Sequence, residues 1–362
     1  MTTLTELPSR SDVILSQKKK GNGLAAVLPI HYSRALIRAF DIQPIELWGP
    51  PRLSSQHGSS HLQPYICSIV HNALSFLKAG NLDIVDVLIV PHACDSLQGF
   101  ASILIDFIQP DQDVIPIYIP RGRRSSDLAF LAAEFKSVHV MLSKITGRSP
   151  DNDKLRECIQ REEKADSLLR ELHHSRVNLS YSDSEFYKLI RSREYLPAED
   201  FTQYAQEALL NRRTTSVNRI PLILSGILPE PMEMFDTINE LGGVVVADDL
   251  ACCGRRLYPP GDSEDPFIRM AQRIIYGPPD PMKGSSIQSR ADLLSHMAYE
   301  SNARGIVFYE VKFCEPELFD LPILRQMLKD MEIPTIVIET DINDKLSARV
   351  INRIEAFLEM IS

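Results

Sequence analysis

The sequence predicts an α/β protein with two similar halves, each built around a parallel sheet of four strands. Short runs of apolar, mostly β-branched residues alternate with longer amphipathic stretches, which is the pattern of parallel strands joined by helices. The runs form two groups of four, separated by a long stretch of helical periodicity. With 362 residues, 44% hydrophobic and 24% charged, the chain is long enough for about two globular domains.

The strands of the first half are expected at residues 24–28, 44–47, 86–90 and 114–119. Helical stretches separate them, at residues 33–40, 64–79 and 98–108. The strands of the second half are expected at residues 220–224, 243–247, 305–309 and 335–338. Each half thus has the strand and helix alternation of a Rossmann-like, flavodoxin-like lobe.

The stretch 126–212 between the two groups is predicted to be helical throughout and to form a connecting layer. Its apolar residues recur at helical spacing, with charges on the other face, at Leu155, Ile159, Leu168, Leu169 and Leu172. We therefore expect an N-terminal arm over residues 1–22 and a first lobe over residues 23–150. The helical layer and the second lobe are expected to occupy residues 151–362.

The charge and the hydropathy of the chain indicate which partners it binds and in which cell compartment it works. The chain has 39 Lys and Arg against 48 Asp and Glu, a net charge of −9, which argues against nucleic acid as a partner. Its apolar runs are far shorter than the roughly 18 residues of a membrane span, and its first residues lack the apolar core of a secretion signal. We expect a cytoplasmic protein without membrane partners, in which the six cysteines are reduced.

The cysteines recur at matching places in the two halves. Cys94 and Cys314 each follow a predicted strand and precede an acid and a helix. One strand earlier, Cys67 follows after a longer loop, and Cys252 with Cys253 follows directly. Ligands of open parallel sheets bind beyond the carboxyl ends of the strands. We therefore expect the two lobes to bring these cysteines to one cleft.

The spacing of the cysteines favours an iron–sulfur cluster among the chemistries of thiols. A CxxC pair, as in structural zinc sites and thioredoxin-type redox sites, does not occur. A single thiol nucleophile would leave the other matching cysteines unexplained. A cluster several ångströms across accepts widely spaced thiolates. Cys158 is expected to be a buried apolar residue, because it lies beside Leu155 and Ile159 on the apolar stripe.

Four ordered stretches resemble the 2-hydroxyacyl-CoA dehydratase and benzoyl-CoA reductase family. They begin AAVLPIHYS, YICSIVHNAL, ILSGILPEP and GIVFYEVKFCEP, and the resemblance covers residues 23–361. It implies an oxygen-sensitive subunit in which Cys67, Cys94 and Cys314 hold a [4Fe–4S] cluster with one iron open to water or substrate. It also implies an ATP-driven, radical-type dehydratase or reductase with an acyl-CoA substrate.

The resemblance also implies a separate ATP-hydrolysing iron–sulfur activator that supplies low-potential electrons. The sequence agrees, because it contains no GxxxxGK[ST] phosphate-binding loop of its own. Members of the family work as homodimers or as heterodimers with a related subunit. Both arrangements remain open for this chain.

One block departs from the family pattern. In DDLACCGRR, Cys252 aligns with the family cysteine and Cys253 is additional. An alternative is therefore the double-cubane [8Fe–9S] branch, whose members reduce small molecules and need about six thiolates. A further alternative is a non-catalytic electron-relay subunit, in which the cluster only passes electrons to a partner.

Weaker candidates for acid–base and binding roles complete the prediction. His31, after the first strand, is a candidate catalytic proton carrier, and His92 a candidate hydrogen-bond donor to cluster sulfur. The expected structural roles are helix capping for Asp95 and Glu315, and orientation of Arg256 by Asp248 and Asp249. Arg121, Arg123 and Arg124 form either a binding site for a CoA phosphate or acidic partner, or a solvated turn.

Overall fold

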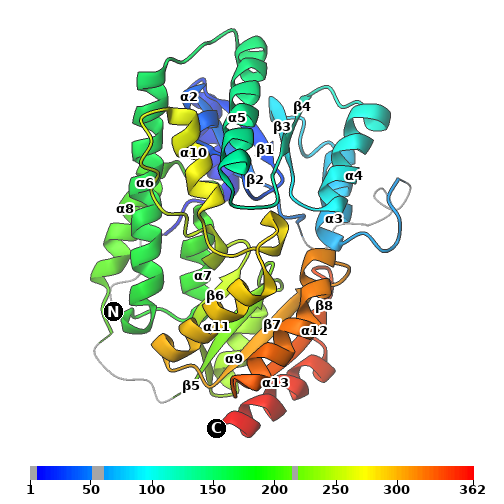
Figure 1. The fold of residues 1–362 in the computed structure, drawn as a ribbon, viewed down its shortest axis with the longest axis vertical. Helices are drawn as coiled ribbons and strands as arrows, with labels where there is room; N and C mark the ends of the chain where they lie inside the picture. The colour runs from blue at the N-terminus through cyan, green and yellow to red at the C-terminus, as the bar shows by residue number, and fades with distance from the viewer. Residues whose placement is uncertain (1–5, 51–60, 214–218) are drawn as a thin grey trace.

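Two parallel four-stranded sheets form the centre of the molecule, one in each lobe (Figure 1). The structure is a computed structural model that describes residues 6–50, 61–213 and 219–362. The first sheet contains β1 (Gly23–Val27), β2 (Ile42–Glu46), β3 (Val87–His92) and β4 (Asp113–Tyr118). The second contains β5 (Ile220–Gly226), β6 (Gly243–Leu250), β7 (Gly305–Val311) and β8 (Thr335–Thr340). The predicted α/β class with two parallel sheets is confirmed.

Both sheets have the same strand order, β2-β1-β3-β4 and β6-β5-β7-β8. The order reverses between β1 and β3 and between β5 and β7, and ligands of open α/β sheets bind at such points. The inner strands are apolar along their length because helices cover both faces of each sheet. Leu24 of β1, Ile89 of β3 and Ile306 of β7 are accordingly fully buried.

The helices around the first sheet are α2 (Arg34–Ala39), α3 (Ser68–Lys78), α4 (Asp95–Ile103) and α5 (Ser125–Thr146). A π-helical segment, η1 (Leu104–Ile108), extends α4. Helix α1 (Arg10–Lys19) precedes this sheet and packs against β1, with Val13 buried. Part of the predicted N-terminal arm is thus a helix that contacts the first lobe.

The stretch 126–212 is divided into several helices, so the prediction of continuous helix is wrong in this detail. After α5 come α6 (Asn152–Ser175), η2 (Arg176–Asn178), α7 (Asp183–Ser192) and α8 (Ala198–Leu210). Gly147 ends α5 in the left-handed conformation, with φ +68°, which glycine adopts without steric cost. The side chain of Asp151 then caps α6. Helices α6 and α8 lie side by side on one flank (Figure 1).

The second half supplies α9 (Glu233–Glu240), η3 (Gly254–Arg256), α10 (Pro266–Ile275), η4 (Pro281–Lys283), α11 (Ile287–Ser301), α12 (Glu315–Asp330) and α13 (Ala348–Ile361). Of these, α10 returns to the first lobe and lies against α5 (Figure 1). Met270 and Ile274 of α10 belong to the same core as Phe135 of α5. The boundary at residue 150 stays a prediction. Elements on its two sides pack against each other, since α10 contacts α5 and α6 contacts α2.

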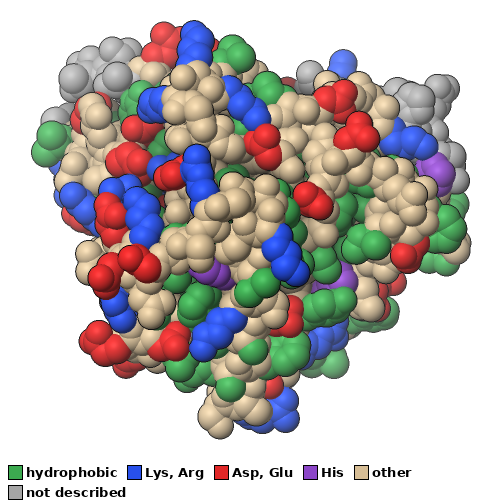
Figure 2. Space-filling view, turned by 90° about the horizontal axis from the view of Figure 1, so that it is seen from above, with side chains coloured by type: hydrophobic (Ala, Val, Ile, Leu, Met, Phe, Trp, Pro, Cys, Tyr) green, Lys and Arg blue, Asp and Glu red, His purple; other side chains and the backbone are tan. Residues whose placement is uncertain are grey.

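The surface carries charges of both signs. On the face shown in Figure 2, Lys and Arg side chains are interspersed with Asp and Glu. Among the helices that the described ranges contain, none combines the length and the apolar character needed to span a bilayer.

Candidate functional site

Three of the predicted cysteines are the N-cap residues of helices. Cys94 follows β3 and precedes α4, and Cys314 follows β7 and precedes α12. Cys67 precedes α3, at the end of a longer connection from β2 whose residues 51–60 lie outside the described part of the chain. Each thiol therefore lies where a first helical turn presents N–H groups without partners in the helix.

The three thiols lie in one neighbourhood. Burial raises the pKa of Cys314 well above its usual range, and the nearby Glu317 raises it further. The thiols of Cys67 and Cys94 act in the same direction on Cys314. Burial likewise raises the pKa of Cys94 to about 12, with Cys67 adding to the effect. Because thiolates influence one another in this way only at short range, the two cysteines of the first lobe lie near Cys314 of the second.

Backbone amides at these helix starts favour negative charge on sulfur. Burial raises the pKa of Cys67, and the N–H groups of its own first turn oppose that rise. The same opposition occurs at Cys94. The amides concerned are those of Val70 and Ile69 in α3 and of Leu97 and Ser96 in α4. These helix starts therefore have the polarity that thiolate ligands require.

The arrangement suits a cluster better than a single metal ion. Within residues 6–50, 61–213 and 219–362, no three or more Cys, His, Asp or Glu side chains lie close enough to hold one ion. A cluster spans several ångströms and takes thiolates from separate loops, as these three helix starts supply them. The donor set therefore fits an iron–sulfur cluster, and the ligand role of Cys67, Cys94 and Cys314 stays a prediction.

A buried ion-pair network supports the start of α12. Glu317 of the first turn is bonded by Arg255 and Arg290, with Arg290 Nη2 2.6 Å from Oε2. Asp249 of β6 contacts both arginines, at 2.9 Å for Arg255 and 3.0 Å for Arg290. Burial opposes ionisation of Glu317, but the two guanidiniums hold the pKa of that carboxyl below its usual range. The network thus ties the turn that begins with Cys314 to β6 and α11.

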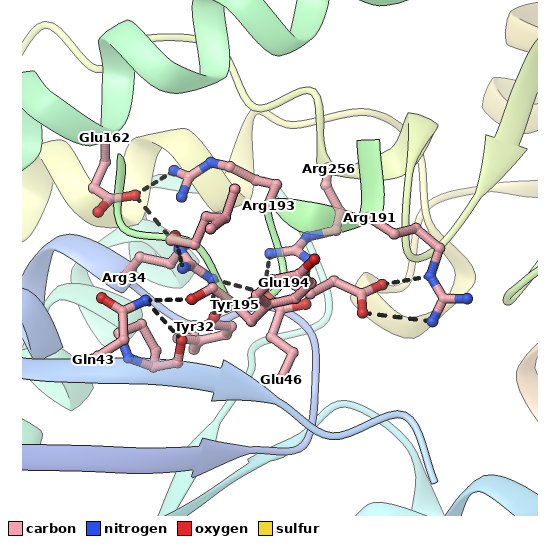
Figure 3. A network of polar contacts seen from close by, with 12 residues as sticks. Tyr32, Arg34, Gln43, Glu46, Glu162, Arg191, Arg193, Glu194, Tyr195 and Arg256 are labelled. Carbon is pink, nitrogen blue, oxygen red and sulfur yellow. Dashed lines mark hydrogen bonds and ion pairs between the residues drawn. The ribbon is translucent and has the colours of Figure 1, made fainter. Parts of the chain in front are cut away.

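A second buried network joins the two lobes (Figure 3). Glu46, at the end of β2, accepts hydrogen bonds from Tyr32 (2.8 Å) and Arg34 (3.1 Å) of its own lobe. It also forms a bidentate ion pair with Arg256 of the second half. The network continues through the pairs Arg193–Glu162 and Arg191–Glu194. Sequence reasoning missed this network, although one signal was available: Glu46 ends a fully buried strand, IQPIE.

The prediction that Asp248 and Asp249 orient Arg256 is wrong. Asp249 pairs with Arg255, as described above. Asp248 accepts hydrogen bonds from the Tyr187 hydroxyl and from the N–H of Gly254, both at 2.8 Å. A side chain at position 254 would collide with the carbonyl oxygen of Asp248, 2.1 Å from an added Cβ, so the turn after β6 requires glycine. Arg256 instead pairs with Glu46 of the first lobe.

The Cys252–Cys253 pair belongs to the same buried core as Cys67 and Cys314 but has charged neighbours of its own. The two sulfur atoms are 3.3 Å apart and both side chains are buried. Burial raises the pKa of Cys253, and Cys252 and Asp248 raise it further. Arg191 of α7 interacts electrostatically with Cys252. The neighbours of the pair thus include α7, and a role of the pair as cluster ligands stays a prediction.

His31 is enclosed between two residues of the second half. Its backbone is left-handed, with φ +63°, which is uncommon outside glycine. Nδ1 lies 3.1 Å from the Tyr258 hydroxyl, and Nε2 lies 3.2 Å from Oδ2 of Asp280, without the angles of a hydrogen bond. Burial lowers the pKa of His31, although Asp280 opposes this. Burial thus favours the neutral imidazole, and the predicted catalytic role of His31 stays a prediction.

The other candidate residues near the first sheet, His92 with Arg121, Arg123 and Arg124, partly contact other residues of the protein. The His92 ring meets Tyr118 edge-on, with centroids 4.6 Å apart, and both its nitrogens are buried without a hydrogen-bond partner among the described residues. Arg123 donates to the carbonyl oxygen of Gly277 at 2.6 Å. Arg124 pairs with Asp127 in the first turn of α5, while Arg121 is exposed.

The positions of Cys158, Asp95 and Glu315 in the structure test two further predictions. Cys158 is 3% exposed and lies in the same apolar core as Leu155 and Ile159, which confirms that it is a buried apolar residue. Asp95 and Glu315 do not occupy the N-cap positions, which belong to the preceding cysteines. They lie instead in the first turns of α4 and α12, where carboxylates interact favourably with the helix dipole.

Comparison with known proteins extends over the whole chain. The chain is 24% identical to the beta subunit of the lactoyl-CoA dehydratase of Anaerotignum propionicum, over 98% of this chain and 100% of that protein. It is 22% identical to the beta subunit of the (R)-phenyllactyl-CoA dehydratase of Clostridium sporogenes, over 96% and 94%. It is also 22% identical to one subunit of the benzoyl-CoA reductase of Thauera aromatica, over 86% and 83%.

A family of known enzyme components matches nearly the full length. The family described as 2-hydroxyglutaryl-CoA dehydratase, D-component, matches residues 29–361. The family resemblance stated from the sequence is thereby confirmed. This chain belongs to the 2-hydroxyglutaryl-CoA dehydratase D-component family, and its relatives are dehydratase and reductase subunits.

Proposed function

We propose that this chain is the iron–sulfur subunit of an ATP-driven, radical-type dehydratase or reductase that acts on acyl-CoA thioesters. In this proposal Cys67, Cys94 and Cys314 hold a [4Fe–4S] cluster between the two lobes. The names of the relatives support the substrate class, because they concern lactoyl-CoA, phenyllactyl-CoA and benzoyl-CoA. When bound, such a cluster supplies a low-potential electron and an open iron that acts as a Lewis acid toward a thioester carbonyl.

The placement of Cys67, Cys94 and Cys314 at the starts of three helices, close enough to influence one another, is the observation that carries the proposal. Cys67 and Cys94 come from the first lobe and Cys314 from the second, yet each pair of these thiols interacts electrostatically. Three thiols that lie together in an acidic protein repel one another once ionised. A positively charged metal centre removes that repulsion, and the N–H groups at the helix starts stabilise what negative charge remains.

Residues of the chain also explain how the lobes hold this geometry. The Glu46–Arg256 pair joins the end of β2 to the segment after β6. The Arg255–Glu317 pair then joins that same segment to the first turn of α12. Positions on both lobes are thus linked through two consecutive arginines. Precise spacing of this kind is what a group bound by both lobes requires.

We propose two kinds of partner for this function. Relatives that are named as subunits of larger enzymes support assembly with a related subunit, or with a second copy of this chain. An ATP-hydrolysing iron–sulfur activator is proposed because the sequence has no phosphate-binding loop of the GxxxxGK[ST] type. The alternative of an electron-relay subunit differs from the main proposal in one respect, because such a subunit binds no acyl-CoA. Equilibrium dialysis of the protein against an acyl-CoA measures this binding.

The double-cubane alternative has less support. It requires Cys252 and Cys253 to join the other thiols, whereas this pair interacts with Asp248 and Arg191. It also requires a sixth thiolate, and Cys158 lies in a separate apolar core that contains no other buried cysteine of the described chain. The single cluster is therefore the proposal.

Iron and sulfide analysis after strictly anaerobic purification tests the proposal. We expect about four iron atoms per chain. About eight would instead support the double-cubane alternative. An iron content near zero under strict anoxia would contradict both. Electron paramagnetic resonance of the reduced protein provides the second readout.

A further inference from the structure

The Cys252–Cys253 pair is a vicinal dithiol with its own surroundings. The sulfur atoms are 3.3 Å apart, in contact, and both cysteines are free. The residues lie between the end of β6 at Leu250 and the start of η3 at Gly254, so their peptide unit belongs to neither a strand nor a helix. Two thiols in contact can bond once the peptide unit between them adjusts, which distinguishes them from isolated buried cysteines such as Cys158.

Cys252 borders a small cavity that residues of both halves line. The cavity has a volume of about 30 Å³, which holds about two water-sized molecules. Its charged lining combines four arginines with three acids: Arg34, Arg193, Arg256, Arg273, Glu162, Asp166 and Glu194. Arg191, which is paired with Glu194 and Glu230, also interacts electrostatically with Cys252. Reactive thiols in proteins occur beside positive charges of this kind, and the cavity admits only small molecules.

We propose that Cys252 and Cys253 form a peroxide-sensitive dithiol that closes reversibly to a vicinal disulfide. The Cys252 sulfur attacks one oxygen of hydrogen peroxide, the O–O bond breaks, and one water leaves with formation of a sulfenic acid. The Cys253 sulfur then attacks the Cys252 sulfur, the S–O bond breaks, and a second water leaves. The two thiols lose two electrons and two protons, which reduce the peroxide to two water molecules.

The position of the pair gives the modification a structural consequence. After Gly254, the chain continues into Arg255, bonded to Glu317 in the first turn of α12, and Arg256, bonded to Glu46 of the first lobe. A vicinal disulfide closes a small ring that contains the peptide bond between the cysteines, so the backbone that leads into both arginines has to change. Oxidation therefore weakens the two contacts that hold the lobes at the predicted cluster site.

Peptide mapping of the full-length protein tests this proposal. Trypsin cuts after Arg219 and after Arg255, and residues 220–255 contain no cysteine besides this pair. The purified chain is treated with hydrogen peroxide under anoxia, denatured and alkylated with iodoacetamide. We expect the peptide of residues 220–255 to be about 2 Da lighter than its reduced form and free of alkyl groups. Dithiothreitol before alkylation should restore two alkyl groups.

Matched variants separate this result from general oxidation. Cys158, also buried, should stay alkylated under the same treatment, and Cys253→Ser should yield no disulfide on this peptide. The oxidised wild type should melt about 2–4 °C below the reduced form, whereas a double variant with Ser at both positions should show no such shift. Retention of both alkyl groups overturns the proposal. So does irreversible oxidation of Cys252 or its pairing with another cysteine.

The test is independent of the proposed function. Peptide mapping follows Cys252 and Cys253 whether or not iron is bound, and iron analysis follows the other three thiols. Protection of the pair by bound iron would appear as two retained alkyl groups together with about eight iron atoms per chain. That outcome overturns the dithiol proposal in favour of the double-cubane alternative.

Discussion

The two lobes share one topology but differ after their equivalent edge strands, β2 and β6. In the first lobe, residues 47–66 separate β2 from Cys67, which reaches the start of α3 and interacts with Cys94 and Cys314. In the second lobe, only Ala251 separates β6 from Cys252, which stays close to α7. Equivalent places in a topology are therefore not equivalent in space, because the length of the connection determines where a thiol lies.

The inner strands β3 and β7 show the opposite behaviour. Both are followed by short connections, and in both cases a cysteine is the N-cap of the next helix. Cys94 and Cys314 therefore match in position along the chain and in position in space. The comparison predicts that Cys252, which follows β6 directly, responds to substitution differently from Cys67, Cys94 and Cys314, which begin helices.

The largest expected effect comes from replacing one thiol of each kind. Cys314→Ala removes one of three predicted ligands, so we expect bound iron after anaerobic purification to fall by more than about tenfold. Cys252→Ala should retain the iron content of the wild type. Cys158→Ala serves as the control for loss of a buried thiol. Equal loss of iron in Cys314→Ala and Cys252→Ala would break the comparison between the lobes.

The junction between the lobes should show the next largest effect. Glu46→Ala leaves the guanidinium of Arg256 buried without its partner, and removal of one member of a buried ion pair costs about 3–5 kcal/mol. Urea unfolding followed by circular dichroism measures this loss. Glu46→Gln, which keeps one hydrogen-bond acceptor for Arg256, should lose less. An unchanged unfolding midpoint in Glu46→Ala would show that the junction does not depend on this pair.

The fold was largely predictable from the sequence, and the reason is visible in the strands. Runs such as VLIV in β3 and GIVFY in β7 are apolar because both faces of a parallel sheet are covered. The prediction failed where local signals are weak. Periodicity alone did not reveal that Gly147 ends α5, or that α10 packs against α5 in the other lobe. The packing of a helix against the other lobe depends on tertiary contacts, and the pattern of apolar residues along the sequence does not contain them.

The candidate site was predictable only in part. The positions of Cys94 and Cys314 follow from the rule that ligands bind at the carboxyl ends of parallel strands. The partners of charged residues were not accessible in the same way. Arg256 has acids close by in sequence but pairs with Glu46, more than two hundred residues away. A buried ion pair between distant segments leaves no periodic signal, so only the lone acid of β2 indicated it.

A smaller effect is expected from pH, through the buried lysine Lys283 of η4. Lys283 of η4 donates to the carbonyl oxygen of Ile274 in α10 at 2.8 Å. Burial lowers its pKa to about 8, with Asp280 opposing and Arg123 adding to the effect. Between this value and the unfolded value of about 10.4, the unfolded chain binds more protons at this lysine. The contribution of Lys283 to stability therefore rises with pH across that window.

The difference between wild type and Lys283→Met isolates this contribution. Other groups titrate in both proteins and cancel in the difference. We expect the difference in unfolding free energy, wild type minus variant, to increase by about 1–3 kcal/mol between about pH 7.5 and 10.5. Urea unfolding at several pH values measures it. A difference that does not change with pH would show that the ammonium group titrates as it does in water.

The smallest expected effect comes from the outer edge of the first lobe, away from the junction. Lys18 Nζ of α1 lies 2.9 Å from the carboxylate of Asp86, and both side chains are substantially exposed. An exposed pair of this kind contributes little, so Lys18→Ala should change the unfolding free energy by less than about 0.5 kcal/mol. Asp86→Ala should cost more, because Asp86 also accepts a hydrogen bond from the N–H of Leu24 at 2.7 Å. If both variants lost the same unfolding free energy, Asp86 would stabilise the protein through the salt bridge and not through its hydrogen bond with the backbone.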